Sequence, residues 1–234
     1  MKLEEYEEIR RVLKLSKKTT AAPSLLNLNC ITTAALYTFP YSDLSIHAPN
    51  APETALNWET IFERLVCRSL PGCCYERGEV LFRLLEHLGY ETVRLEVRCV
   101  SKGEASPYRH EHMALAVRLD REWHLVDSAW AQVFPGQAIK LENGHVTETP
   151  RMMIRTVHAS TRKDENVKSS LDASLMRQWD VEYLSPRVEY DDHREEEPTG
   201  KWKIIFTFDF ERQQLDNFKQ QVSSEVTCKS SLCV

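Results

Sequence analysis

The sequence predicts an α+β fold, with a helical N-terminal domain, a β-barrel-like second domain and a truncated third α/β region. Two observations support this prediction. Apolar residues recur at helical spacing up to about residue 90, and apolar and polar residues then alternate with period two. At 234 residues the chain is long enough to bury a sizeable core. We place the domains at residues 1–90, 91–190 and 191–234.

Four helices are expected in the first region, at residues 6–15, 24–37, 58–66 and 74–89. Asn57 is a good N-cap residue for the third helix. The fourth helix begins at Cys74 after a Pro-Gly turn and closes at Gly89. Residues 48–52 carry two prolines and are expected to form a loop.

Strands are expected in the rest of the chain, at residues 92–100, 112–117, 123–126, 179–183 and 203–208. A tight polar connection at 119–122 joins the second and third strands, so these two should form a hairpin. The polar segments 160–170 and 191–197 are expected to be solvated surface loops. A short helix is expected at 215–222, and residues 223–234 show no clear periodicity.

Composition excludes several classes of protein. The formal net charge of −5 provides no basic surface for nucleic acid. No apolar run approaches the roughly 20 residues that a bilayer-spanning helix needs, and the acidic N-terminus lacks the apolar segment of a secretion signal. We therefore expect a cytoplasmic protein without nucleic-acid or membrane partners, and we expect it to be a monomer.

The seven cysteines are odd in number and lack the spacing of a disulfide framework, so most are expected to be buried thiols. Judged by residue type alone, a metal could be ligated by Cys73, Cys74, His110 and His112. Adjacent cysteines and a His-x-His pair do not match the spacing of structural zinc ligands, so no metal is predicted. A disulfide between vicinal cysteines would be strained, and Cys73 is therefore expected to pack.

Cys74, His112 and Asp127 are the most informative residues of the chain. A thiol is a weak nucleophile until a base removes its proton, and imidazole is the usual base near neutral pH. A carboxylate that fixes the tautomer of the imidazole makes the base more effective. The positive end of a helix dipole favours a thiolate at Cys74, and the predicted hairpin brings the other two residues to neighbouring strand ends. The three residues predict covalent acyl-transfer or amide chemistry.

The segments around these residues resemble the arylamine N-acetyltransferases. Members of that family carry Arg-Gly-Gly-x-Cys-x-Glu-x-Asn-x-x-Phe, which is similar to residues 70–82, and the alignment places Cys74 at the nucleophile. Residues 38–47 resemble the family's Ile-Pro-Phe-Glu-Asn-Leu segment, and residues 205–218 resemble the strand and helix leading into its third domain. His112 and Asp127 match the family's base and orienting aspartate. The resemblance covers most of the chain and implies a cysteine-protease-like Cys-His-Asp core in a cleft between the first two domains.

The resemblance implies a ping-pong transfer of an acetyl group. His112 would remove the proton of Cys74, and the thiolate would attack acetyl-CoA, the acyl donor. An arylamine, arylhydrazine or N-hydroxyarylamine would then take the acetyl group from the cysteine. The resemblance also implies two sets of binding residues: Trp130, Tyr75 and Phe39 for the acceptor, and Gly72, Ser128 and Ala129 for coenzyme A.

The chain departs from the family pattern at several positions. Leu70 and Pro71 replace the motif's arginine and first glycine, and Arg68 lies two positions away. Gly78 replaces the motif's asparagine, and two glycines of the family's Asp-x-Gly-Phe-Gly are alanines within residues 127–131. An added methyl group hinders close approach of a backbone to a co-substrate. We therefore expect a weak or altered preference for the acyl donor.

Two other functions stay open at this point. Transglutaminase-like enzymes share the order Cys, His, Asp, and residues 123–130 resemble their strand ending in Asp-x-x-Trp. The reaction would then be amide hydrolysis or transfer. Residues 39–47 favour the acetyltransferase, because they are not part of that pattern. The other alternative is a catalytically impaired homologue that acts as a binding module.

Overall fold

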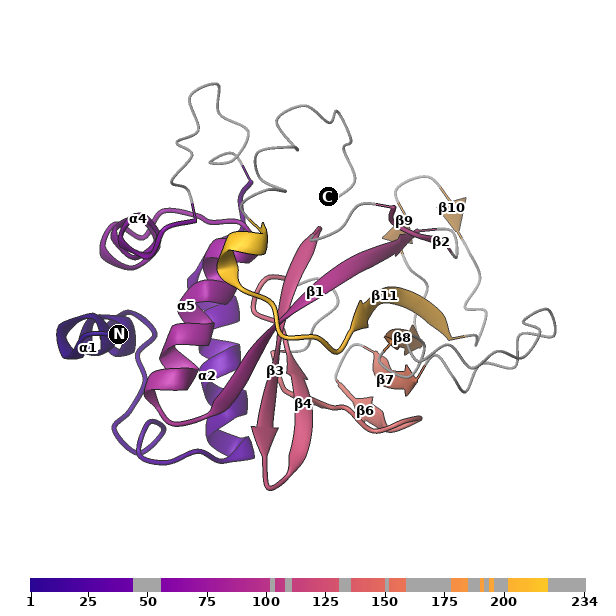
Figure 1. Cartoon of the computed structure of the whole chain (residues 1–234), viewed down its shortest axis with the longest axis horizontal. Helices are drawn as coiled ribbons and strands as arrows, with labels where there is room; N and C mark the ends of the chain where they lie inside the picture. The colour runs from indigo at the N-terminus through magenta and orange to yellow at the C-terminus, as the bar shows by residue number, and fades with distance from the viewer. Residues whose placement is uncertain are drawn as a thin grey trace.

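The computed structural model describes residues 1–43, 56–101, 104–107, 111–130, 136–149, 152–158, 178–184, 190–191, 194–195 and 202–218. Helices gather on one side of the molecule and a curved antiparallel sheet fills the other (Figure 1). The helices are α1 (Leu3–Val12), α2 (Leu25–Thr38), α4 (Trp58–Ile61), the π-helix η1 (Phe62–Cys67) and α5 (Cys74–His87). The strands are β1 (Glu91–Ser101), β2 (Glu104–Ala105), β3 (His112–Leu119), β4 (Glu122–Val126), β5 (Ile139–Lys140), β6 (Val146–Glu148), β7 (Met153–His158), β8 (Gln178–Leu184), β9 (Tyr190–Asp191), β10 (Arg194–Glu195) and β11 (Lys203–Asp209).

The main sheet runs in the order β5-β4-β3-β1-β11-β8-β7-β6, with β2 paired to β1. Its two ends approach each other, because the Thr156 hydroxyl of β7 donates to the carbonyl oxygen of Lys140 in β5 at 3.0 Å. The N–H of Gly144 also donates to the carbonyl of Thr156 at 2.8 Å. The sheet is therefore a nearly closed barrel, and the predicted α+β class is confirmed. The expected domain boundary at residue 190 falls inside this sheet, since β11 lies between β1 and β8.

Capping residues explain where the helices begin and end. The Ser24 side chain accepts the N–H of Asn27 at 3.2 Å before α2. The Asn57 side chain accepts the N–H of Thr60 at 2.8 Å, which confirms it as the N-cap of α4. Gly89 follows α5 with φ of +84°, a left-handed conformation that glycine adopts without steric cost.

The hairpin of β3 and β4 forms as predicted. Its two connecting residues, Asp120 and Arg121, have φ of +48° and +70°. Left-handed residues at both turn positions match the right-handed twist of the strands that they join. The turn fixes the register, with Leu119 opposite Glu122, and thereby sets which residues meet at the far end of the hairpin.

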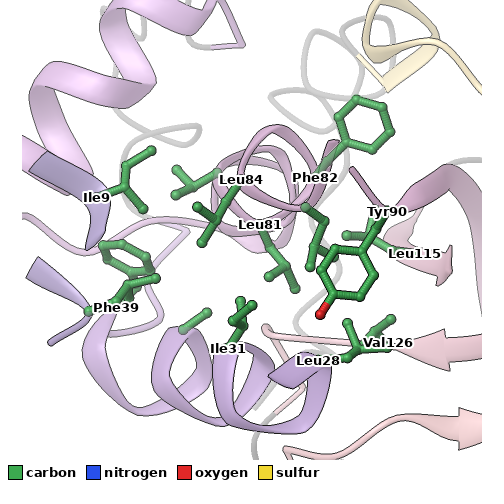
Figure 2. Packing of buried hydrophobic residues seen from close by; sticks show 14 of the residues in the cluster. Ile9, Leu28, Ile31, Phe39, Leu81, Phe82, Leu84, Tyr90, Leu115 and Val126 are labelled. Carbon is green, nitrogen blue, oxygen red and sulfur yellow. The ribbon is translucent and has the colours of Figure 1, made fainter. Parts of the chain in front are cut away.

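Helix α5 is the central element of the hydrophobic core. Figure 2 shows Leu81 of α5 directed toward Ile31 of α2, with Leu115 and Val126 of the sheet close by. A second buried cluster fills the barrel around Phe206 and its neighbours. Each fully buried apolar side chain contributes about 1.5–3 kcal/mol of transfer free energy. The position of α5 against β1 and β3 is therefore firmly fixed.

Several sequence predictions need correction. Strands β2, β5, β6 and β7 were not expected, and the helix expected at 58–66 changes to a π-helix after Ile61. The charged segment expected as a loop at 191–197 contains β10 and the end of β9, which pair with each other. Cys30 and Cys67 are exposed, although most cysteines were expected to be buried. The predicted loops at 48–52 and 160–170, and residues 219–234, lie outside the described residues.

In the described part of the chain, no helix combines the length and the apolar character needed to span a bilayer.

Candidate active site

Helix α5 begins with two adjacent cysteines that have different environments. Cys73 is the N-cap: its sulfur accepts the N–H of Glu76, and its own N–H donates to Glu76 Oε2 at 3.0 Å. Burial, together with the nearby charge of Glu76, raises the pKa of the Cys73 thiol far above its usual range. A protonated thiol is a poor nucleophile. The local geometry therefore favours Cys74, the first helical residue, as the reactive cysteine.

The carboxylate of Glu76 is anchored by Arg64 of the π-helix, with which it forms an ion pair. Arg64 also donates to the carbonyl oxygen of Pro71 at 3.3 Å, so it ties η1 to the turn before α5. The sequence pattern pointed to Arg68 as the displaced arginine of the motif, but the arginine that pairs with Glu76 is Arg64. The contact spans 12 residues and depends on how η1 folds back, which no local pattern reveals.

Gly72 is part of the same turn, and close packing against Leu65 explains why this position is a glycine. A Cβ at Gly72 would lie 2.8 and 2.9 Å from the two methyl carbons of Leu65. Its N–H donates to the carbonyl of Pro40, and its carbonyl accepts the N–H of Ser42, both at 3.1 Å. Because its N–H is already engaged, Gly72 is not a donor to a bound thioester in this arrangement.

His112 and Asp127 meet at the open end of the β3–β4 hairpin. Nε2 of His112 lies 2.5 Å from Oδ2 of Asp127, and both side chains are buried. The other carboxylate oxygen accepts the N–H groups of Ala129 at 2.7 Å and Trp130 at 3.1 Å. The aspartate is thus held through both oxygens, and it fixes the orientation of the imidazole.

The environment of Asp127 keeps its carboxylate ionised. Burial acts to raise the pKa, but the charge of His112 and the hydrogen bonds from His112, Ala129 and Trp130 outweigh burial and hold the pKa below its ordinary value. An ionised carboxylate on one side of an imidazole stabilises the imidazolium that forms when the ring accepts a proton.

Cys74 lies in the same buried cluster as Met113 and Ala129. Met113 follows His112 in β3, and the N–H of Ala129 is bound by Asp127. One turn after Cys74, Gly78 leaves room for Met113, because a Cβ at Gly78 would lie 2.6 Å from Met113 Cε. Cys74, at the N-terminus of α5, therefore packs against residues that neighbour His112 and Asp127 in the chain.

Of the three residues predicted to bind the acceptor, Trp130 contacts the imidazole of His112. Its ring meets that of His112 edge to face, with centroids 5.1 Å apart. The Trp130 ring also stacks on Phe206 of β11, with centroids 5.4 Å apart. The strand Lys203–Asp209 therefore supports the site from within the barrel.

Tyr75 and Phe39, the other two predicted acceptor residues, occupy packing positions. Tyr75 is buried, its hydroxyl donates to the carbonyl of Glu111 at 3.1 Å, and its ring lies 5.5 Å from Phe218. Phe39 belongs to the main helical core, away from the cluster that holds Cys74.

Ser128 and Ala129 lie in the turn that follows β4. Both are buried, and the Ser128 hydroxyl has no hydrogen-bond partner within the described structure. The described residues contain no group of three or more His, Cys, Asp and Glu side chains that could hold a metal.

A family model described as N-acetyltransferase matches residues 24–234 of the chain. The chain belongs to the arylamine N-acetyltransferase family. An arylamine N-acetyltransferase from Mycolicibacterium smegmatis is 31% identical over 131 residues, which make up 54% of this chain and 47% of that relative. The alignment thus spans about half of the relative's length.

Solved structures of the family share the fold. The structure of an arylamine N-acetyltransferase from M. smegmatis aligns with a TM-score of 0.73 at 22% identity, covering 99% of this chain and 73% of that one. The Bacillus cereus arylamine N-acetyltransferase, described as having a Cys-His-Glu catalytic triad, aligns with a TM-score of 0.71 at 16% identity, covering 96% of this chain and 77% of that one. This likeness shows the helical and barrel-like architecture.

Proposed function

We propose that the chain transfers an acetyl group from acetyl-CoA to an arylamine or arylhydrazine, with Cys74 as the acyl carrier. The hydrogen bond between His112 and Asp127, formed beside the helix end that carries Cys74, is the observation that carries the proposal. Membership in the family supports the reaction class. A related protein described with a Cys-His-Glu triad supports the grouping of cysteine, histidine and carboxylate.

In the first half-reaction, His112 accepts the proton of Cys74 as the sulfur attacks the thioester carbonyl. We assign stabilisation of the oxyanion to the N-terminus of α5, because the positive end of the helix dipole favours the negative charge that develops beside Cys74. The bond from the acetyl carbon to the sulfur of coenzyme A then breaks, and the departing thiolate takes the proton from His112. Asp127 stabilises the imidazolium during both transfers.

In the second half-reaction, the amine nitrogen attacks the acetyl-cysteine and gives its proton to His112. The bond between the acetyl carbon and Cys74 then breaks, and the departing Cys74 sulfur takes the proton back from His112, which restores the starting state. The first half-reaction exchanges one thioester for another and is nearly thermoneutral, so there the site mainly needs to position the reactants. We assign Trp130 to the acceptor side, because an aromatic amine gains by packing against an aromatic ring beside the base.

We place coenzyme A beside Ser128 and Ala129, which follow Asp127 directly. Ala129 packs in the cluster of Cys74, so its methyl group occupies space next to the nucleophile. For this reason we expect acetyl-CoA to bind and react less well than it would with glycine at this position.

The test is the intact mass of the protein after incubation with acetyl-CoA. We expect the wild type and Cys73→Ser to gain one acetyl group, and Cys74→Ala to gain none. Serine replaces the capping sulfur at position 73 with a hydroxyl oxygen, a good N-cap acceptor, so the control retains the start of α5. An unmodified wild type would contradict the proposal. If Cys74 still reacted rapidly with iodoacetamide, a transglutaminase-like amide donor would replace acetyl-CoA; if it reacted slowly, the impaired homologue would be favoured.

A further inference from the structure

Arg77 is a fully buried arginine one helical turn after Cys74. It is 1% exposed and stands among the largest side chains that the fold buries completely. Residues three apart on a helix share a face, so Arg77 and Cys74 point to the same side of α5. Sequence reasoning did not single out this residue, and the acyl-transfer steps above do not use it.

The hydrogen bonds of Arg77 connect two distant segments. Nη2 donates to the carbonyl oxygen of Leu36 near the end of α2 at 3.0 Å. Nη1 donates to the carbonyl oxygen of Ala129 at 3.4 Å. Since the N–H of Ala129 is bound by Asp127, the guanidinium holds the other side of the same short turn.

The charge of Arg77 is not neutralised by an ion pair with any described carboxylate. Its only described hydrogen-bond partners are the two carbonyls, and its Nε has no partner in the described part of the chain. A buried cation without an anion is costly, and such groups are usually paired. The groups that face it electrostatically are Asp127, Cys74, Tyr41 and Cys73. Burial lowers the pKa of the Arg77 guanidinium, whereas these groups act to raise it.

We propose that Arg77 is a positioning residue whose charge stabilises the thiolate of Cys74 and the carboxylate of Asp127, while its two hydrogen bonds hold the Asp127 turn against α2. The inference rests on the proposed function for its biological meaning, but its chemistry concerns only the ionisation of Cys74. Arginine suits this role because it stays protonated when buried and its planar fork reaches two carbonyls at once.

The test is the pH dependence of Cys74 alkylation by iodoacetamide, resolved by peptide mass spectrometry. Arg77→Met removes the charge at similar volume, and we expect it to move the alkylation midpoint upward by about one pH unit. Arg77→Lys keeps the charge, and we expect its midpoint to stay within a few tenths of a unit of the wild type. Arg83→Met is the matched control, because it removes an arginine from the opposite side of α5, and we expect no shift.

An unchanged midpoint in Arg77→Met would overturn the proposal, as would equal shifts in the Met and Lys variants. Thermal denaturation identifies any variant that does not fold, and Arg77→Gln then takes the place of Arg77→Met. Alkylation requires no acetyl-CoA. A wild type that is alkylated normally but never acetylated would therefore refute the proposed function and leave the role of Arg77 standing.

Discussion

The two sides of helix α5 both bury charge, but they do so in different ways. On one side, Glu79 is fully buried and binds Arg94 through two hydrogen bonds of 2.8 and 3.1 Å and Arg83 through one of 2.6 Å. On the other side, the hydrogen bonds of Arg77 to described residues go only to carbonyl oxygens, and its charge faces Cys74 and Asp127.

This difference separates a structural cluster from a reactive one. The guanidinium of Arg94 also lies 3.4 Å from the ring centroid of Phe82, and that of Arg83 lies 4.5 Å from the ring centroid of Trp58. The Glu79 cluster is thus paired and covered, and it fastens α5 to β1 and α4. Unpaired buried charge and perturbed pKa values are typical of functional sites. The side with Cys74 has both, whereas on the side with Glu79 the buried carboxylate is paired with two arginines.

The largest expected effect is on the reactive side. Asp127→Asn removes the charge that stabilises the His112 imidazolium, and we expect the rate of Cys74 acetylation to fall by roughly 10⁴-fold. The rate is measured by single-turnover mass spectrometry on folded protein. A fall of less than about tenfold, the effect of 1.4 kcal/mol, would mean that the two sides of α5 do not differ as described.

Glu79→Gln addresses the structural side. It leaves Arg94 buried beside a neutral partner, and we expect the free energy of unfolding to drop by about 3–5 kcal/mol. Denaturant unfolding measures the loss. The acetylation rate of the folded fraction should stay close to that of the wild type. A rate as low as that of Asp127→Asn would contradict the assignment of a purely structural role to Glu79.

Gly72→Ala distinguishes a packing role from a co-substrate-binding role for the residue that precedes the two cysteines at the start of α5. The new methyl group would meet both methyl carbons of Leu65, so we expect a loss of about 1–3 kcal/mol in unfolding free energy. Adding Leu65→Val should recover part of that loss, which a double-mutant cycle quantifies. A raised KM for acetyl-CoA with unchanged stability would instead assign Gly72 to the co-substrate.

The smallest effect is the contribution of Asp127 to acid stability. Its folded-state pKa lies below the unfolded value of about 3.9. The unfolded chain therefore binds more protons in this range, and the stabilisation is present above about pH 3.9 and lost as the pH falls through the folded pKa. We expect urea unfolding between about pH 5 and pH 3 to show a shallower loss for Asp127→Asn than for the wild type. Parallel curves would contradict the assigned shift.

Local sequence patterns predicted the parts of the fold that depend on local physics. Asn57 caps α4, and Gly89 ends α5, because capping and left-handed backbone depend on single residue types. The β3–β4 hairpin followed from strand alternation and a tight turn, and it brought His112 and Asp127 together.

Other features depend on contacts between distant segments, which no local pattern encodes. The two carbonyl partners of Arg77 lie 41 and 52 residues away from it in the chain. Strand β11 was recognised, but its place between β1 and β8 depends on pairings across about half of the chain. Strands β5 and β6 are too short to show a recognisable alternation of apolar and polar residues.

The central claim is that Cys74 is activated by its surroundings, and competition among the cysteines for iodoacetamide near neutral pH tests it most directly. Cys30 and Cys67 are exposed, whereas Cys74 is only 6% exposed. We expect Cys74 to be alkylated first in the wild type and to lose this lead in His112→Gln. Alkylation that follows exposure, with Cys30 and Cys67 ahead of Cys74 in both proteins, would contradict the account.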